Sequence, residues 1–376
     1  MNLKRLVFWD PCISPHKSQF LSALAELLTN VEVILLADSD LPEARRDQGW
    51  VSYSPVGYRQ FVAPTVSLCI AIAEEAPEST LHVFSGLRHV QTIVLGLKLV
   101  RRCGAKYALM SEPRVFEGKK GYLRYFQSLV SESGIRKEVQ FVLAIGRNGP
   151  PWFHSVGYSP DKVFPFAYFV DPGQSSSLAL RTVGPIRVGY LGRLVPMKGV
   201  HFLLEAARNL PSDKFELVIA GSGENEYELR YEAASQSLAV EFRGSIPMQE
   251  VSTFLASIDI LVLPSISSDD GWGVVVSEAL LAGTAVIASS CVGASVVLND
   301  LARGVCVRPK SAEAIANAIN KLVDNKCFDQ HFRLYRKVWA INHLSAIAGA
   351  QYFSRLLDHK FRGAKRPVDF FEEDNP

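Results

Sequence analysis

Short apolar runs alternate with helical patterns twice along this chain, and the alternation strongly limits the folds open to it. Near the N-terminus, the strand-like run Leu6–Trp9 is followed by a helical pattern and by a second run, Val31–Leu36. The same order begins again at Arg187, with runs at Val188–Leu191 and Phe215–Ala220. A strand–helix–strand order predicts a parallel sheet with crossover helices. We therefore expect an α/β protein with two Rossmann-like domains whose parallel sheets face each other across a cleft.

The region between the two series lacks periodicity and is rich in proline, glycine and serine, including Ser175–Ser177. Such a composition is typical of a linker. A length of 376 residues also suits two domains better than one. The predicted organisation is an N-terminal domain over residues 1–168, a linker over 169–186, a C-terminal domain over 187–340, a helix over 341–362 that packs back on the N-terminal domain, and a tail over 363–376 that we expect to be disordered.

The overall charge and the cysteines narrow the class of protein. A formal net charge of +2 is nearly balanced, which argues against a nucleic-acid-binding protein. The six cysteines show no CxxC spacing and no histidines form an HExxH pattern, so we predict reduced thiols and no metal site. The N-terminus runs directly into a strand-like segment, and no secretory signal is visible there. We expect a cytoplasmic protein.

The stretch Asp270–Gly283 has the composition of a ligand-binding loop that leads into a helix. Gly271 and Gly273 allow a ligand to approach the backbone where the helix begins, and the unpaired N–H groups of a helix start suit a phosphate. Glu278 lies further along and offers a hydrogen-bond acceptor. Together these groups indicate a nucleotide with hydroxyl groups. A loop entering an ordinary core helix is the alternative interpretation of this stretch by itself.

A second candidate loop, Gly192–Gly199, follows the first strand of the second series. Ligands of open α/β sheets bind at the carboxyl ends of such strands. Arg193 offers a planar guanidinium for phosphate oxygens and Lys198 a mobile positive charge, so both could bind one diphosphate. Two solvated loop cations are the alternative.

Four motifs in this order resemble family 4 of the retaining glycosyltransferases, of the group 1 type and with the GT-B fold. They are Gly-Arg-Leu-x-x-x-Lys-Gly from Gly192, Gly-Ser-Gly-Glu from Gly221, Phe-Arg-Gly-Ser-Ile from Phe242, and Asp-Gly-Trp-Gly-x4-Glu-Ala from Asp270. The four motifs in this order are together specific for the family, and the resemblance covers about Arg187 to Val323. The N-terminal half resembles the family only in its layout and in its approach to the linker.

The resemblance implies a role for each matching residue. Arg193 and Lys198 would hold the donor diphosphate and neutralise its charge as it departs, and Glu278 would bind the ribose hydroxyls. Asp270 stands where the family has a glutamate that contacts the donor sugar, and its side chain is shorter by about 1.5 Å. The donor-binding positions implied in this half of the chain are Gly192, Arg193, Lys198, Ser245, Ile246, Asp270, Gly271, Trp272, Gly273, Val274, Val275 and Glu278.

Three residues of the N-terminal half are further candidates, because strand ends point into the expected cleft. We hypothesise that His16 or Lys17 faces the donor phosphates and that Glu112 faces the sugar or the acceptor hydroxyl. A helix-start histidine and a loop carboxylate before Pro113 are the ordinary alternatives. The expected catalytic residues are therefore Arg193, Lys198, Asp270 and Glu112.

The resemblance implies a retaining, metal-independent hexosyltransferase with no cofactor. It would move a sugar from a nucleotide-diphosphate sugar to a saccharide or lipid-linked acceptor in bacterial cell-surface polysaccharide or lipopolysaccharide synthesis. Two other functions are compatible with the same architecture. One is a nucleotide-sugar 2-epimerase, and the other is a non-catalytic nucleotide-sugar-binding protein, for which Asp270 is the one hint.

A basic and aromatic segment near Lys119–Leu129 predicts an amphipathic helix. Lys119, Lys120 and Arg124 interleave there with Tyr122, Leu123, Tyr125, Phe126 and Leu129. Such a helix can lie on an anionic membrane surface, which would place the protein at the inner face of the cell membrane. A core-packing helix with a solvated basic face is the alternative.

Two weaker motifs suggest other enzyme classes. Asp38-Ser39-Asp40 has the Asp-x-Asp form of metal-dependent glycosyltransferases, but a loop that enters a helix explains it more simply. Gly221-Ser222-Gly223 follows a strand as in dinucleotide oxidoreductases, but Glu226 stands where the third glycine would be.

Overall fold

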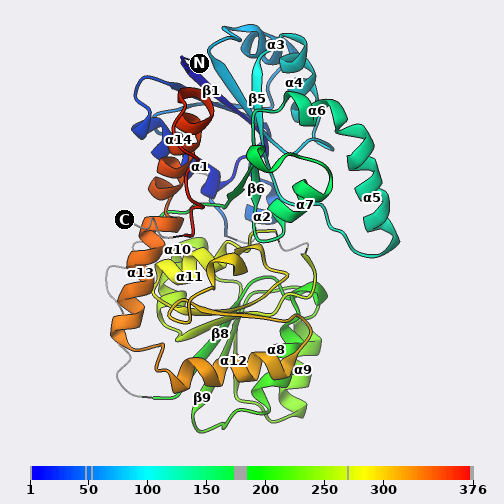
Figure 1. The fold of residues 1–376 in the computed structure, drawn as a ribbon. Coiled ribbons are helices and arrows are strands. Elements are labelled where there is room, and N and C mark those ends of the chain that lie inside the picture. Colours follow the sequence, from blue (N-terminus) through cyan, green and yellow to red (C-terminus); the bar gives the residue numbers. More distant parts are fainter. Residues whose placement is uncertain (1, 47–48, 52–53, 173–183, 269–270, 373–376) are drawn as a thin grey trace. The chain divides into compact units, whose positions relative to one another are not determined.

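The computed structural model describes residues 2–46, 49–51, 54–172, 184–268 and 271–372 (Figure 1). The chain forms two compact units. Unit 1 comprises Met1–Asp171 together with Ala346–Pro376, and unit 2 comprises Pro172–Ser345. Each unit contains one sheet in which all paired strands are parallel.

The sheet of unit 1 has the strand order β3-β2-β1-β4-β5-β6-β7. Its strands are β1 (Arg5–Cys12), β2 (Glu32–Ser39), β3 (Arg59–Val62), β4 (Thr80–Ser85), β5 (Lys106–Ser111), β6 (Val142–Ile145) and β7 (Val163–Phe166). Its α-helices are α1 (Pro15–Leu27), α2 (Glu43–Arg46), α3 (Val66–Glu74), α4 (Gln91–Arg102), α5 (Gly118–Ser131), α6 (Ser133–Glu138), α7 (Gly149–Ser155) and α14 (Ala346–Arg362).

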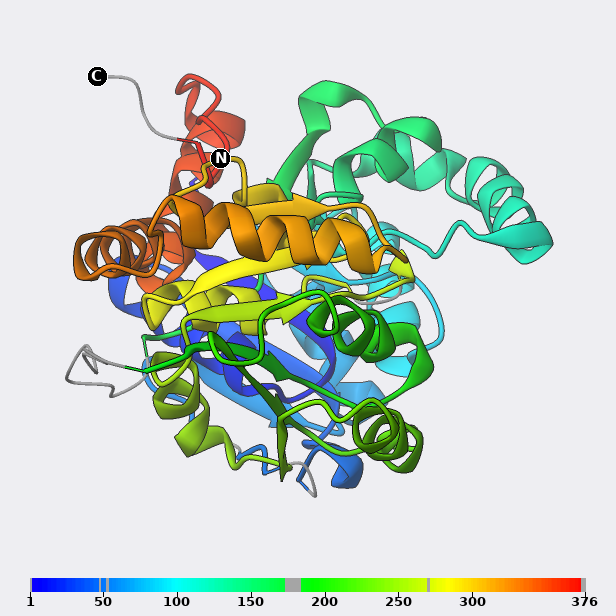
Figure 2. The same cartoon turned by 90° about the horizontal axis from the view of Figure 1, so that it is seen from below.

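The sheet of unit 2 has the strand order β10-β9-β8-β11-β12-β13. Its strands are β8 (Ile186–Leu191), β9 (Phe215–Ala220), β10 (Val240–Gly244), β11 (Ile260–Leu263), β12 (Ala285–Ser289) and β13 (Gly304–Val307). Its α-helices are α8 (Val200–Ala207), α9 (Glu226–Ser235), α10 (Met248–Ala256), α11 (Val275–Leu281), α12 (Ala312–Asp324) and α13 (Gln330–Leu344). Figure 2 shows both units along a perpendicular direction.

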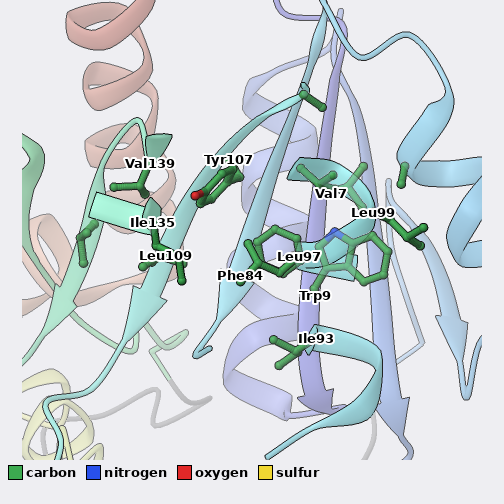
Figure 3. Packing of buried hydrophobic residues seen from close by; sticks show 14 of the residues in the cluster. Val7, Trp9, Phe84, Ile93, Leu97, Leu99, Tyr107, Leu109, Ile135 and Val139 are labelled. Carbon is green, nitrogen blue, oxygen red and sulfur yellow. The ribbon is translucent and has the colours of Figure 1, made fainter. Parts of the chain in front are cut away.

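Strand β1 has apolar side chains on both faces of the unit 1 sheet, because successive residues of a strand point in opposite directions. Val7 and Trp9 join the cluster under α3 and α4, which also contains Phe84 and Tyr107 (Figure 3). Trp9 stacks on Phe84 with ring centroids 5.5 Å apart. A sheet covered on both faces requires such continuous apolar strands, which is why β1 could be predicted from the sequence.

The other face of the unit 1 sheet packs against α1 and α14 through phenylalanines. Phe353 of α14 is fully buried, and its ring centroid lies 6.1 Å from that of Phe8, 6.0 Å from that of Phe20 and 6.4 Å from that of Phe166. The last helix of the chain therefore completes the core of the first unit.

The tail after α14 is ordered as far as Glu372, so the expectation of a disordered tail is wrong over this range. Phe370 is buried, with its ring centroid 5.4 Å from that of Phe169. Arg366 donates to the carbonyl oxygen of Val163 at 2.7 Å and lies over the ring of Phe164. The buried ring of Phe370 and the contacts of the Arg366 guanidinium therefore hold a segment that has no helical or strand periodicity.

The unit boundaries also differ from the predicted ones. Phe169 and Val170, which we assigned to the linker, are buried residues of unit 1. Residues 341–345, which we assigned to the last helix, belong to unit 2, because α13 continues to Leu344. Helix α13 is held there by Arg333, which donates to Asp259 at 3.0 Å and to the carbonyl oxygen of Ile258 at 2.6 Å.

The sequence also predicts strands at Leu81–Phe84, Tyr107–Met110, Phe141–Ile145, Val240–Arg243, Ile258–Leu263 and Thr284–Ala288, and these runs correspond to β4, β5, β6, β10, β11 and β12. Strands β3, β7 and β13 were not predicted. All three lie at an edge of their sheet. Edge strands contact one neighbour only, so they tolerate polar residues and proline and lack a long apolar run. Pro165 within β7 is an example.

We predict that Phe353→Ala destabilises unit 1 by about 3–5 kcal/mol, because it leaves a cavity among the surrounding rings. Thermal unfolding followed by calorimetry should show one transition moved to lower temperature and the other unchanged. Tyr227→Ala on α9 removes an exposed ring and is the control. Unchanged transitions in Phe353→Ala would contradict the role assigned to α14.

Candidate functional site

The loops that carry the sequence motifs lie at the carboxyl edge of the unit 2 sheet, which is the side of the sheet where its parallel strands end. Strand β8 lies between β9 and β11, so the chain leaves β8 toward one side of the sheet and β11 toward the other. Ligands of open α/β sheets bind at such a switch point. The loop with Arg193 and Lys198 follows β8, and the loop with Gly271 and Gly273 follows β11.

Close backbone contacts join neighbouring loops at this edge. A β-carbon on Gly221 would lie 1.8 Å from the carbonyl oxygen of Gly192, and one on Gly199 would lie 2.3 Å from that of Pro264. Both glycines also have positive φ angles of 135° and 67°. Any other residue would force the loops apart, so these glycines determine how closely the loops after β8, β9 and β11 approach.

The two candidate cations stand on the loop after β8. Arg193 is exposed, and its guanidinium has no hydrogen bond or ion pair with any residue that the structure describes. Lys198 ends the short 3-10 helix Pro196–Lys198 and is half-buried. The amide of Ile266 donates to the carbonyl oxygen of Met197 at 2.9 Å and fixes this turn against the loop after β11.

The glycine turn before α11 presents backbone amides. Gly273 has φ 76°, and a β-carbon there would lie 2.6 Å from the Cγ1 atom of Val292. No described carbonyl accepts a hydrogen bond from the amides of Gly273, Val274 or Val275. Such amides suit an anionic ligand.

Trp272 is buried in unit 2, and its indole N–H donates to Ser277 at 2.9 Å. Its side chain therefore packs the turn rather than facing a ligand, and a donor contact at this position would involve the backbone. Asp270 lies outside the described residues.

Two further predicted positions follow β10. The hydroxyl groups of Ser245 and Ser222 lie 2.8 Å apart, and this contact links the loops after β10 and β9. Ser245 is exposed and Ile246 is half-buried. The loops after four neighbouring strands, β10, β9, β8 and β11, are thus connected along one edge.

Glu278 lies in α11, directly behind the glycine turn. Part of its surface reaches solvent, yet burial around the carboxyl group raises the pKa of Glu278 to about 7. No described side chain donates a hydrogen bond to this carboxylate. A desolvated carboxylate without a donor is poised to accept hydroxyl groups from a ligand.

The carboxyl edge of the unit 1 sheet carries a polar cluster that sequence reasoning found only in part. The Lys17 ammonium lies 3.3 Å from the Asp10 carboxylate, 3.4 Å from the Ser85 hydroxyl and 3.1 Å from the Met110 sulfur. The Ser85 hydroxyl also donates to Asp10. Lys17 was predicted, whereas Asp10 and Ser85 were missed. The available signal was a polar residue ending the apolar runs of β1 and β4.

His16 lies in the first turn of α1 and is buried against Trp50, with ring centroids 5.2 Å apart. Neither ring nitrogen has a hydrogen-bond partner among the described residues. Burial and the nearby charge of Arg45 lower the pKa of His16 to about 4. The ring is therefore neutral near pH 7 and supplies no positive charge to a phosphate.

Glu112 follows β5 and accepts a hydrogen bond from the Tyr168 hydroxyl at 2.9 Å. Burial and the Glu112 carboxylate raise the pKa of Tyr168, so the phenol keeps its proton and remains a donor. Tyr168 orients Glu112 and was not predicted. It follows β7, a strand that the sequence did not reveal.

Both aspartates of the Asp-x-Asp motif accept hydrogen bonds from backbone amides. Asp38 accepts from the backbone amide of Thr92 at 3.1 Å at the start of α4, and Asp40 accepts from the amide of Leu41 at 2.7 Å. Within the part of the chain that is described, no three His, Cys, Asp or Glu side chains gather as a metal site. None of the described helices is both long and apolar enough to cross a membrane.

Comparisons with known proteins relate the C-terminal half to one family. Residues 180–339 match the family described as glycosyl transferases group 1. An uncharacterized glycosyltransferase of Methanocaldococcus jannaschii is 30% identical over 38% of this chain and 37% of its own length. A lipopolysaccharide core biosynthesis glycosyltransferase of Rhizobium meliloti, LpsE, is 31% identical over 35% of this chain and 38% of its own length. The chain therefore spans less than half of the length of either relative.

A solved structure covers nearly the whole chain. Anabaena HepE, crystallised in complex with UDP, aligns with 94% of this chain and all of its own, with a TM-score of 0.69 and 17% identity. This likeness, together with the two parallel sheets, shows the GT-B type of α/β fold with two Rossmann-like units. The sequence similarity to group 1 glycosyltransferases thus covers residues 180–339, and the likeness to HepE concerns the fold.

We predict that Glu278→Gln stabilises the ligand-free protein more at pH 8 than at pH 5. Because the pKa of this carboxyl group is raised from 4.5 to about 7 on folding, its contribution to stability is fully present below pH 4.5 and is lost between about pH 4.5 and 7. The variant should melt a few degrees above wild type at pH 8, because about 1–3 kcal/mol of desolvation cost is removed. Glu228→Gln on exposed α9 is the control. Parallel pH profiles for Glu278→Gln and wild type would contradict the enclosure of this carboxylate.

Proposed function

We propose that this chain, which is similar to group 1 glycosyltransferases over residues 180–339, transfers a hexose from a nucleotide-diphosphate sugar with retention of anomeric configuration. The acceptor is a saccharide or a lipid-linked sugar of a bacterial cell-surface polysaccharide or lipopolysaccharide. The reaction needs no metal ion and no cofactor.

One observation carries the proposal, namely the adjacency of the loops after β8 and β11. The first supplies Arg193 and Lys198, and the second supplies backbone amides from Gly273 onward. A diphosphate carries negative charge on several oxygens, and a guanidinium, an ammonium and amides are complementary to it. A ligand bound there would occupy the switch point of the sheet.

The nucleoside is held by acceptors and by backbone. Glu278 accepts hydrogen bonds from the ribose hydroxyls, and these donors stabilise its desolvated carboxylate. The backbone near Ser245 and Ile246 faces the base, a role that also rests on the family resemblance. Asp270 contacts the donor sugar, a role that rests on the family resemblance alone.

Catalysis in this proposal comes from stabilising the departing diphosphate. As the glycosidic bond breaks, negative charge grows on the β-phosphate, and Arg193 and Lys198 neutralise it. Glu112, oriented by Tyr168, serves the sugar or the acceptor hydroxyl from unit 1. Lys17 adds positive charge at that edge, although Asp10 already compensates part of it.

The relatives support the choice of substrate. HepE was crystallised with UDP and also with UDP-glucose, so UDP-sugars are the first donors to test. LpsE acts in lipopolysaccharide core biosynthesis, which favours a cell-surface glycan as product. We place the protein in the cytoplasm, where nucleotide sugars would reach it.

A donor screen followed by a transfer assay tests the function. Thermal shifts with UDP-, GDP- and ADP-sugars identify the donor, since a bound ligand stabilises the fold. NMR of the product with and without acceptor then shows retention or inversion, and EDTA tests metal independence. Epimerised donor without acceptor, or binding without turnover, would replace the proposal by one of the two other functions.

We expect Arg193→Ala and Lys198→Ala each to lower kcat by about 10²–10³, because each removes charge stabilisation of the leaving group. Arg208→Ala and Lys214→Ala are the matched controls. They change exposed cations near the start of β9, at the amino-terminal ends of the strands and away from the proposed site. Circular dichroism should show that all four variants are folded. Full activity of both Arg193→Ala and Lys198→Ala would refute the diphosphate site.

A further inference from the structure

Helix α5 of unit 1 has two apolar faces, and only one of them is covered. Residues three and four positions apart lie on one side of a helix, which places Tyr122, Phe126 and Val130 in one stripe with Leu123 beside it. These four side chains are exposed by 60%, 60%, 75% and 71% respectively. Figures 1 and 2 both show α5 at the periphery of unit 1.

The inner face of α5 is fixed to unit 1 by contacts that do not involve this stripe. Tyr125 packs against Trp152 of α7, with ring centroids 6.4 Å apart, and its hydroxyl donates to the carbonyl oxygen of Ser155 at 3.1 Å. Arg114 donates to the Ser128 hydroxyl at 3.0 Å. The helix therefore stays in place without help from its outer face.

The charges on α5 have one sign. Its sequence, Gly118–Ser131, contains Lys119, Lys120 and Arg124 and no acidic residue. Lys119 and Lys120 are exposed and form no ion pair with any described residue. Lys119 lies three and seven positions before Tyr122 and Phe126, so an ammonium group stands within the apolar stripe. Arg124 is directed inward and donates to the carbonyl oxygen of Val115.

We propose that the outer face of α5 docks on an anionic lipid bilayer. The docking surface consists of Lys119, Lys120, Tyr122, Leu123, Phe126 and Val130. Apolar side chains on a helix lying in the membrane interface enter the acyl boundary, while lysines bind anionic headgroups. Both components are needed to explain a face that combines four large exposed apolar side chains with two exposed lysines that form no ion pair with a described residue.

The docking can be tested independently of the glycosyl transfer proposed above, because lipid binding is measured without donor or acceptor. If both proposals hold, α5 would keep unit 1 at the surface where a lipid-linked acceptor resides. Loss of docking would then impair activity on membrane-bound acceptor and leave activity on a soluble acceptor intact.

Vesicle co-sedimentation of the full chain tests the docking. We expect binding to vesicles of phosphatidylcholine with 30% phosphatidylglycerol, weak binding to phosphatidylcholine alone, and release as NaCl rises from 0.1 to 0.5 M. Leu123→Ser/Phe126→Ser should weaken the partition coefficient at least about tenfold, through lost apolar burial. Lys119→Gln/Lys120→Gln should weaken it about 10- to 30-fold, and only on anionic vesicles.

Two matched double variants control for loss of any exposed side chain. Tyr227→Ser/Tyr231→Ser removes exposed rings from α9, and Lys98→Gln/Lys321→Gln removes exposed lysines from α4 and α12. Both should bind as wild type does. Thermal unfolding should match wild type for all variants, since none of the altered side chains is buried.

Binding that ignores lipid charge, or that the α5 variants leave unchanged, would overturn the proposal. A second copy of this chain is the other possible occupant of this face. Sedimentation velocity without lipid tests for it, because it measures whether the protein dimerises. A dimer that Leu123→Ser/Phe126→Ser converts to monomer, without lipid binding by wild type, would assign the face to self-association instead.

Discussion

Close backbone contact between loops at the carboxyl edge of the unit 2 sheet is the constraint on which the candidate site depends. Gly221 approaches Gly192, and Gly199 approaches Pro264, at distances that no β-carbon tolerates. These contacts keep the loops after β8, β9 and β11 together, so that Arg193, Lys198 and the amides after Gly273 lie along one edge. Glycine at these positions is required by geometry before any ligand is considered.

The charged side chains at the carboxyl edges of the two sheets differ in whether they have partners among the described residues. In unit 1, Lys17 forms an ion pair with Asp10 and a hydrogen bond with Ser85, so its charge already has partners within the cluster. In unit 2, Arg193 has no described partner and Glu278 has no described donor. Burial of the Glu278 carboxylate without a described donor costs stability in the free protein, and a ligand that supplies hydrogen-bond donors recovers that cost. Arg193 is exposed and solvated, so its positive charge is accessible to an anionic ligand. Unit 2 is therefore the half whose described charged groups remain open to an anionic ligand.

Helix α5 shows the same principle on an exposed surface. Its inner face is satisfied by Tyr125, Arg114 and Ser128, while its outer face exposes phenylalanine, leucine, tyrosine and valine beside two lysines. The sequence pattern allowed either a membrane surface or a core-packing helix. The structure shows that both faces are apolar, and that packing within unit 1 accounts for only one of them.

The sequence by itself determined the α/β class, the internal strands and the motif loops, because buried parallel strands need continuous apolar runs and glycine turns carry a local signature. Only the tertiary structure decided the edge strands β3, β7 and β13, the attachment of Phe370 and the pairing of Lys17 with Ser85. These features join residues far apart in the chain, and their local patterns are weak. Which face of a helix or sheet is covered depends on strand order and on where the helices pack. The periodicity of apolar residues along the chain carries no information about either.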